Sequence, residues 1–177
     1  MQTSETHLTR KTLAGTLTAM FLAALGVDFL VHAGILARYY VHPGPALLTT
    51  QQLVRRIPFG YASMLLTLVF ELWLLSRMGV RSSKGGAWFG AVFGTVLGVA
   101  GAIGLFSLVP LGPNYLAMVA VSQIMEYTIA GALAGSSLAS GRALRVVIIG
   151  FVTLVIGVAA GLAMQAATPV PALTASM

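Results

Sequence analysis

Five long apolar runs constrain the fold of this chain more than any other feature. They cover roughly residues 12 to 36, 57 to 77, 86 to 110, 116 to 138 and 143 to 165. A helix of about 20 apolar residues is long enough to cross the hydrocarbon core of a bilayer. The sequence therefore predicts an all-α integral membrane bundle with five transmembrane helices.

The composition excludes an ordinary soluble domain, because 58% of the residues are hydrophobic, 8% are charged and the mean hydropathy is +0.93. The runs and their connections occupy nearly all 177 residues, so we expect one transmembrane domain over residues 1–177. The ten Lys and Arg residues lie singly or in pairs at the ends of runs. We therefore expect lipid head groups, and not nucleic acid, as their partners. The absence of cysteine excludes disulfides and thiolate metal sites.

The positive charges also predict an orientation, because positively charged connections are retained in the cytoplasm. Seven fall on the side of the N-terminus: Arg10, Lys11, Arg77, Arg81, Lys84, Arg142 and Arg145. Three fall on the other side: Arg38, Arg55 and Arg56. We expect a multi-pass protein of a bacterial plasma membrane, with its N-terminus inside and its C-terminus outside. A cleaved signal peptide over the first run is the alternative, although the run continues too far and no small-x-small site follows it cleanly.

The acidic residues provide the main clue to function. Asp28, Glu71 and Glu126 lie inside apolar runs, and only Glu5 lies in an obviously aqueous position. An ionisable group at bilayer depth is costly, usually faces the interior of a bundle, and often marks a proton, ion or ligand site. The three carboxyl groups are therefore candidates for such a site.

Asp28 and His32 form the first candidate pair. They are four residues apart and so lie on one face of a helix, close enough for a hydrogen bond between carboxylate and imidazole. Such a pair can handle protons. The alternative is a pair that only fixes helix packing.

Glu71 belongs to a polar stripe with Ser63 and Thr67, which precede it at four-residue spacing. We expect this stripe to face other helices and not lipid. The alternative for Glu71 is a structural ion pair with Arg77, which lies about 9 Å further along the helix axis.

Glu126 is the strongest single candidate for a proton-binding or cation-binding group. It lies near the middle of the fourth run, where a charged carboxylate is most costly. Ser122, Gln123 and Tyr127 surround it as a polar patch. A purely structural hydrogen-bonding role for Glu126 is the alternative.

The three buried acids are predicted to lie within about 10 to 12 Å of depth in the bilayer. One shared cluster with His32 is therefore geometrically possible. Three carboxylates near one imidazole cannot all be ionised in a medium of low dielectric constant, so such a cluster requires a bound proton or cation.

Glycines at four-residue spacing predict close helix contacts, because small residues let helix backbones approach in lipid. They are Gly90, Gly94 and Gly98 in the third run, Gly131 and Gly135 in the fourth, and Gly157 and Gly161 in the fifth. The pattern leaves open whether the partner helix belongs to the same chain, to a second copy or to another membrane subunit.

Two local features concern the second run. Pro58 is expected in the first turn of its helix, where a missing N–H matters little. The preceding connection, residues 38 to 56, is rich in Tyr, Arg and Pro and predicts an interfacial belt. The alternative is a lid over Asp28 and His32.

Two stretches carry a resemblance to a known group. The Asp28 to His32 string Asp-Phe-Leu-Val-His is one, and the Gly86 to Gly98 run with Pro110, Pro113 and the Glu126 to Gly135 stretch is the other. Over residues 25 to 138 the chain resembles a group of small uncharacterised bacterial multi-pass membrane proteins that carry an Asp-Phe-x-x-His string in the first helix. The fifth run and the connection after the first run depart from that group, which often has a Trp-Arg-Pro string there. The resemblance implies architecture and no mechanism.

Two main functions follow from these patterns. The first is a buried acid and His site that binds a proton or cation and is coupled to transport, built on Asp28, His32, Glu71 and Glu126. The second is an accessory or assembly subunit of a larger membrane complex, with the acids in structural roles. A haem- or chromophore-associated subunit with His32 as axial ligand is a third. No catalytic motif is visible and no cofactor is required, so we expect a non-enzyme. A divalent metal held by Asp28, His32 and Glu126 stays open.

Overall fold

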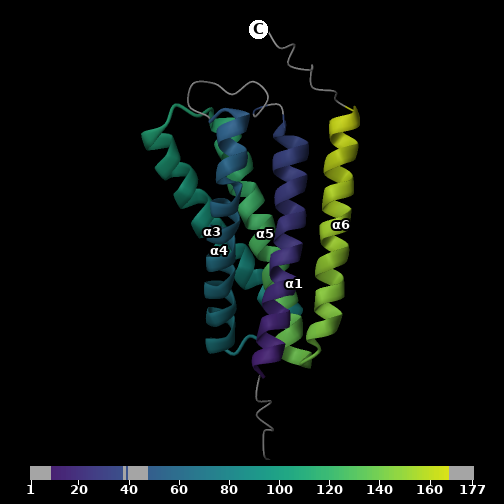
Figure 1. Cartoon of the computed structure of the whole chain (residues 1–177). Coiled ribbons are helices and arrows are strands. Elements are labelled where there is room, and N and C mark those ends of the chain that lie inside the picture. The colour runs from purple at the N-terminus through teal and green to yellow at the C-terminus, as the bar shows by residue number, and fades with distance from the viewer. Residues whose placement is uncertain (1–8, 38, 40–47, 168–177) are drawn as a thin grey trace, which may run out of the picture.

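Five long helices make up the part of the chain that the computed structural model describes, which is residues 9–37, 39 and 48–167. The elements are α1 (Arg10–Phe29), the short π-helical segment η1 (Leu30–Ile35), α3 (Thr50–Arg77), α4 (Ser83–Leu108), α5 (Pro113–Ser140) and α6 (Ala143–Ala167). Figure 1 shows them alternating in direction, so that the start of α1 and the end of α6 lie at opposite ends of the bundle. All five are long and apolar enough to cross a membrane, which confirms the predicted fold class.

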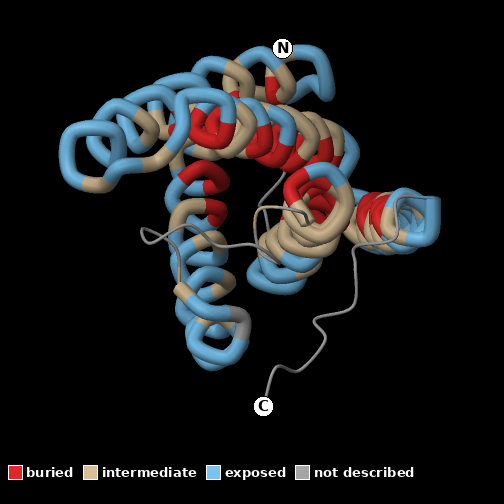
Figure 2. Tube along the Cα trace, turned by 90° about the horizontal axis from the view of Figure 1, so that it is seen from above, coloured by how far each residue is buried: buried red, intermediate tan, exposed pale blue. Residues whose placement is uncertain are grey.

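The outer surface fits a lipid environment. Large apolar side chains such as Phe59, Trp88, Ile103 and Leu108 are exposed along the helices. Figure 2 shows the buried residues gathered where helices face one another and the exposed ones around the outside. A soluble monomer rarely exposes so much contiguous apolar surface, whereas lipid tails cover it without cost.

The tightest contact joins α4 to α5. The buried residues of α4 are all glycines at four-residue spacing: Gly86, Gly90, Gly94 and Gly98. A Cβ atom on any of them would collide with a backbone carbonyl of α5, at Gly131, Tyr127, Gln123 and Ala120 respectively. The partner helix of this glycine pattern therefore belongs to the same chain. Absent side chains allow a backbone approach that any other residue would prevent.

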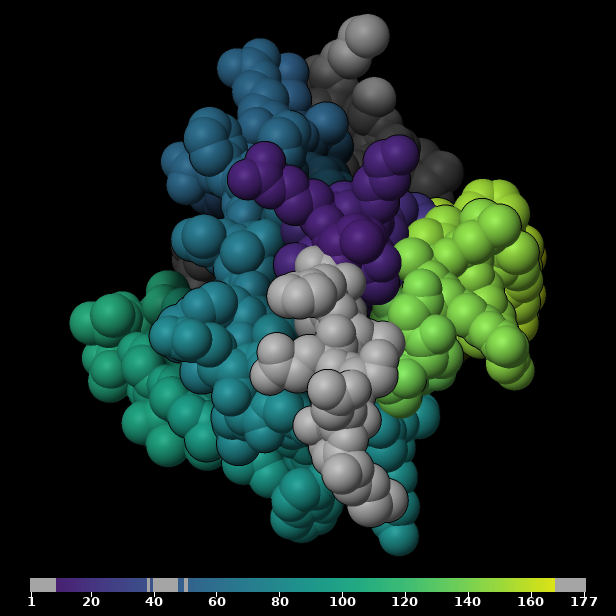
Figure 3. Space-filling view, turned by 90° about the horizontal axis from the view of Figure 1, so that it is seen from below, coloured from purple at the N-terminus to yellow at the C-terminus, as the bar shows by residue number. Residues whose placement is uncertain are grey.

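A second close contact joins α6 to α1. A Cβ on Gly157 would collide with the backbone of Gly26, and one on Gly161 would press against the ring of Phe29. Figure 3, which views the molecule from the end where α1 begins, shows α6 lying beside α1 on the side away from α3. Buried hydroxyls join α1 to α5, because Thr16 and Ser137 share a hydrogen bond of 2.6 Å. These contacts make α1 and α5 the centre of the bundle.

Helix α3 packs through only one of its halves. Its C-terminal half buries Leu68, Glu71, Leu72 and Leu75, whereas no residue from 51 to 67 is buried. The N-terminal half of α3 therefore does not pack tightly against the neighbouring helices. This leaves space between α3 and the ends of α1 and α5.

The start of α3 corrects the sequence analysis. The side chain of Thr49 accepts a hydrogen bond from the backbone of Gln52, and the Gln52 side chain accepts one from the backbone of Thr49. This reciprocal cap starts the helix well before residue 57. Pro58 therefore lies inside α3, and the prediction that it occupies the first turn was wrong. The predicted connection 38 to 56 is also shorter than expected, although its residues 38 and 40–47 lie outside the described residues.

The last turns of the first span, which α1 and η1 form together, are wound more widely than an α-helix. In η1 the backbone N–H of Leu36 donates to the carbonyl of Val31, a separation of five residues, at 2.7 Å. The side-chain amide of Gln165 on α6 donates to the carbonyl of Ala33, which holds this segment against α6. Wide turns of this kind occur often at functional sites. His32 lies within the widened turn.

Candidate functional site

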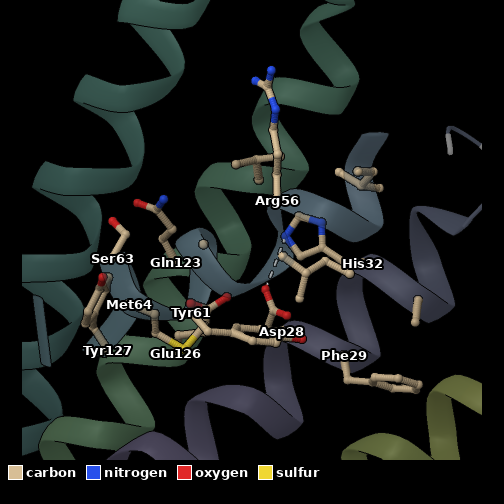
Figure 4. Close-up of a pocket in the computed structure, with 15 residues that line it drawn as sticks. Asp28, Phe29, His32, Arg56, Tyr61, Ser63, Met64, Gln123, Glu126 and Tyr127 are labelled. Atoms are coloured by element: carbon tan, nitrogen blue, oxygen red, sulfur yellow. Dashed lines mark ion pairs between the residues drawn. The ribbon is translucent and has the colours of Figure 1, made fainter. Parts of the chain in front are cut away.

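A cavity of about 520 Å³ occupies the space between the end of the first span, the N-terminal half of α3 and the N-terminal half of α5. Its polar lining comes from all three: Asp28, His32, Arg56, Tyr61, Ser63, Gln123, Glu126 and Tyr127. Its apolar lining comes from them as well: Phe29, Ala33, Leu53, Ile57, Met64 and Val119. The loosely packed half of α3 thus forms one wall. Figure 4 shows this site.

Asp28 and His32 face the cavity from the first span. Their Oδ1 and Nε2 atoms lie 3.6 Å apart, and their side chains are 21% and 27% exposed. That separation is an ion-pair contact if the imidazole is protonated, but it is too long for the hydrogen bond that the four-residue spacing predicts. The widened turn at His32 changes the spacing along the helix, which explains the difference.

Glu126 faces the same cavity from α5. It is 5% exposed, and its Oε1 accepts a hydrogen bond of 2.5 Å from the hydroxyl of Ser122, one helical turn earlier. Its carboxyl group is close enough to that of Asp28 for the two to interact electrostatically. Two acidic groups from different helices therefore share one compartment, as the sequence made possible.

Tyr127 and Thr67 join α5 to α3 at the inner edge of the cavity. Their hydroxyl oxygens lie 2.6 Å apart, and the Thr67 hydroxyl also donates to the carbonyl of Met64 at 2.9 Å. Thr67 thus faces another helix, as the polar stripe predicted. Ser63 lines the cavity but is exposed at its rim.

The rim is formed largely by the extra turns of α3. Leu53 and Arg56, which the sequence analysis placed in a connection, are helical and line the cavity. Figure 4 shows the guanidinium of Arg56 pointing away from Asp28 and Glu126. Within the described residues Arg56 forms no ion pair with either acid. Among the described residues, no Lys or Arg side chain therefore forms an ion pair with these carboxyl groups.

Glu71 does not line this cavity. It is fully buried at the opposite end of α3, and neither of its carboxyl oxygens has a hydrogen-bond partner among the described residues. A Cβ on Gly90 or on Gly131 would come within 3.0 Å of its Oε1. The carboxyl group is thus enclosed where α3 meets the glycine seam between α4 and α5. The possibility of one cluster holding all three acids is corrected accordingly.

The proposed ion pair between Glu71 and Arg77 is also absent. Arg77 instead places its guanidinium 6.0 Å from the ring centre of Trp73, and no ion pair of Glu71 occurs among the described residues. Both Arg77 and Trp73 are exposed, so they lie on the outer face of α3 while Glu71 points inward. Helical geometry explains the outcome, because a separation of six residues points the two side chains in different directions.

Nine lining residues escaped the sequence analysis as site candidates: Phe29, Ala33, Leu53, Arg56, Ile57, Gly60, Tyr61, Met64 and Val119. A pattern for those on α3 is present in the sequence, because the lining positions 53, 56, 57, 60, 61 and 64 follow the three- and four-residue spacing of one helix face. Arg56 and Tyr61 are the polar members of that face. The sequence analysis followed the acidic residues and their polar neighbours along the chain, and so missed both.

The arrangement does not form a metal site by geometry. Among the described residues, no three His, Asp or Glu side chains lie close enough together to hold a metal ion. Asp28, His32 and Glu126 line one cavity without forming such a group.

The comparisons with known proteins supply no relative for this chain. No protein-family model matches it, and neither does any curated protein or solved structure. The resemblance drawn from the Asp-Phe-x-x-His string therefore stays a prediction. Any function has to be argued from the site itself.

Proposed function

We propose that this chain is a small multi-pass membrane protein that binds a proton or a cation in the cavity between α1, α3 and α5, and that this binding serves transport. The observation that carries the proposal is the meeting of Asp28 and Glu126, from different helices, in one compartment. An ionised carboxylate without a partner is costly inside a membrane protein. A protonated His32 can accompany Asp28, at 3.6 Å, but one imidazole cannot neutralise both acids, so the pair requires a further proton or a cation.

The distribution of Lys and Arg supports a direction for the cavity. The start of α1, the α3–α4 connection and the α5–α6 connection lie at one end of the bundle (Figure 1). They carry the larger share of the positive charge, which favours a cytoplasmic position. The cavity lies toward the other end and would open to the outside of a bacterial plasma membrane.

Proton binding by the purified protein tests the proposal. The detergent-solubilised full chain is titrated from alkaline to acidic pH, and its proton uptake is compared with that of Asp28→Asn and Glu126→Gln, in sodium, in potassium and in neither. We expect each variant to take up fewer protons or to lose a dependence on the inorganic cation. Glu71→Gln is the matched control for the dependence of proton uptake on sodium or potassium. It should leave that dependence unchanged, because the Glu71 carboxyl group is buried away from the cavity. Unchanged titration of both cavity variants would overturn the proposal.

The alternative function is an accessory or assembly subunit, which one observation favours. Gly101 and Gly104 continue the glycine pattern of α4, but nothing in the described chain lies within 4 Å of where their Cβ atoms would be. Exposed Ile103 and Phe106 flank them. A helix of another membrane protein would fit against this end of α4. Purification of the chain as a lone, monodisperse monomer in mild detergent would contradict this alternative.

A further inference from the structure

The size of the cavity goes beyond what a proton or an inorganic ion needs. Its volume of about 520 Å³ falls within the range of pockets that bury small organic molecules, roughly 300 to 1,000 Å³. A proton on a carboxyl group requires no such space. No three His, Asp or Glu side chains of the described residues lie together as ligands, so an inorganic cation here would depend on carbonyl, hydroxyl or water oxygens for most of its coordination.

The walls of the cavity suit an apolar body. Leu53, Ile57 and Met64 from α3 face Phe29 from α1 and Val119 from α5. Small-molecule sites are mostly apolar and carry a few polar groups that fix the orientation of the ligand. A strictly hydrophilic ion would leave these apolar surfaces unused.

The charged groups suit a positive ligand. Asp28 and Glu126 approach the cavity from α1 and α5, and neither forms an ion pair with Lys or Arg among the described residues. Among the described residues Arg56 is the only Arg of the lining, and its guanidinium points away from both carboxyl groups (Figure 4). His32 lies 3.6 Å from Asp28, so one basic side chain faces two carboxylates, and a cation between them would compensate the remaining negative charge.

Aromatic side chains add to the same preference. Tyr61 of α3 and Tyr127 of α5 both line the cavity, and Figure 4 shows the Tyr61 side chain reaching toward Asp28. The faces of aromatic rings attract organic cations, and most strongly where water is excluded. Carboxylate and aromatic groups together thus recognise a cation that also has apolar surface.

We infer that the ligand of this cavity is a monovalent organic cation with an apolar body, such as a lipophilic ammonium or phosphonium compound, held between Asp28 and Glu126. This inference rests on the proposed function and names the class of cation. The apolar walls take up the body of the ligand, and the two carboxylates and Tyr61 surround its charge. The loosely packed half of α3 gives access, because Arg56, Ile57 and Ser63 are exposed at the rim.

Binding of radiolabelled tetraphenylphosphonium to the full chain in detergent tests the inference. We expect saturable binding that Glu126→Gln and Asp28→Asn each weaken by roughly tenfold or more, because each variant removes one charge facing the ligand. Glu71→Gln removes an equally buried carboxyl group outside the cavity and should keep the affinity within about twofold. Neutral triphenylphosphine oxide, which has similar aromatic surface and no net charge, should compete poorly.

The outcomes separate this inference from the function on which it rests. If proton uptake or inorganic cation binding depends on Asp28 and Glu126 while tetraphenylphosphonium does not bind, the organic ligand is wrong and the proposed function stands. If the neutral oxide competes as well as the cation, the cavity is only an apolar site and the inference is overturned. If the cavity variants match wild type in both experiments, both proposals fail. Monodisperse elution of each variant excludes misfolding as the cause of lost binding.

Discussion

Two regions of this bundle that meet at Tyr127 enclose a buried carboxyl group in opposite ways. Around Asp28 and Glu126, helix α3 stands off and leaves a cavity of about 520 Å³ with polar neighbours. Around Glu71, α3 packs tightly against the seam of α4 and α5, and both carboxyl oxygens remain without hydrogen-bond partners among the described residues. The region around Asp28 and Glu126 has room for a ligand, whereas the region around Glu71 has room only for the side chain itself.

The difference comes from the side chains next to each acid. Gly90 and Gly131 flank Glu71 and let two backbones close over it. Near Glu126, the neighbouring positions on α3 carry the larger side chains of Tyr61 and Met64, which line the cavity. Acidic residues in similar apolar runs thus reach different environments because small or large neighbours set the distance between helices. The charge alone does not predict a site.

The largest expected effect would come from disturbing the close contact between α4 and α5 beside Glu71. Gly131→Ala places a methyl group against the backbone carbonyl of Gly86 and within 3.0 Å of Glu71 Oε1. We expect a loss of about 3 kcal/mol in the free energy of unfolding, at the upper end for overpacking, because a backbone cannot move aside as a side chain can. Thermal unfolding in detergent measures the loss. Gly104→Ala is the matched control, because no other helix of the described chain comes within 4 Å of its added methyl group. Equal effects of the two substitutions would contradict the close seam.

A change of sign separates the two kinds of carboxyl group. Glu71→Met keeps an unbranched side chain and removes two oxygens that have no partners, so we expect a gain of about 1 to 2 kcal/mol in the free energy of unfolding. Glu126→Met removes the acceptor of the Ser122 hydroxyl and should lower stability. Unfolding by sodium dodecyl sulfate measures both. A clear loss of stability in Glu71→Met would mean that this carboxyl group has a partner in the folded protein.

The smallest expected effect concerns Tyr127, which lies between the cavity and Glu71. Tyr127 lines the cavity, bonds to Thr67 and lies near enough to both Glu71 and Glu126 to interact electrostatically. A double-mutant cycle with Tyr127→Phe and Thr67→Val should give a coupling of about 1 kcal/mol, the worth of one buried hydrogen bond. Tyr127→Phe paired with Thr95→Val is the control, because Thr95 bonds only within its own helix, to the carbonyl of Ala91. A coupling near zero for the first pair would remove this link.

The helical spans can be predicted from the sequence because, in lipid, each apolar run must satisfy its own backbone hydrogen bonds. A run of apolar residues of sufficient length forms a helix whatever its neighbours are, and all five runs did so. The helix ends were less predictable, since a cap such as Thr49 with Gln52 depends on a few side chains. The close contact of Gly90 with α5 followed the small-residue spacing, although the identity of the partner helix required the fold.

The site was predictable only in part. Spacing placed Asp28 beside His32 and Ser122 beside Glu126, because four residues along a helix fix neighbours on one face. The separation of Glu71 from these residues depends on how far α3 stands from α5 along its length. That distance arises from packing between residues remote in sequence, which no local pattern contains.

The widened turn η1 lets this part of the helix tolerate a change in the number of residues. Since the turn holds one residue more than an α-helix would, a deletion anywhere within Leu30–Ile35 can be absorbed by tightening it to the regular pitch. The residues beyond the deletion would then keep their positions around the axis, because the lost residue is the extra one that the wide turn accommodates. Among related chains, the gain or loss of a single amino acid here would leave the helix end in place, whereas the same change within a regular α-helix would rotate everything beyond it by about 100°.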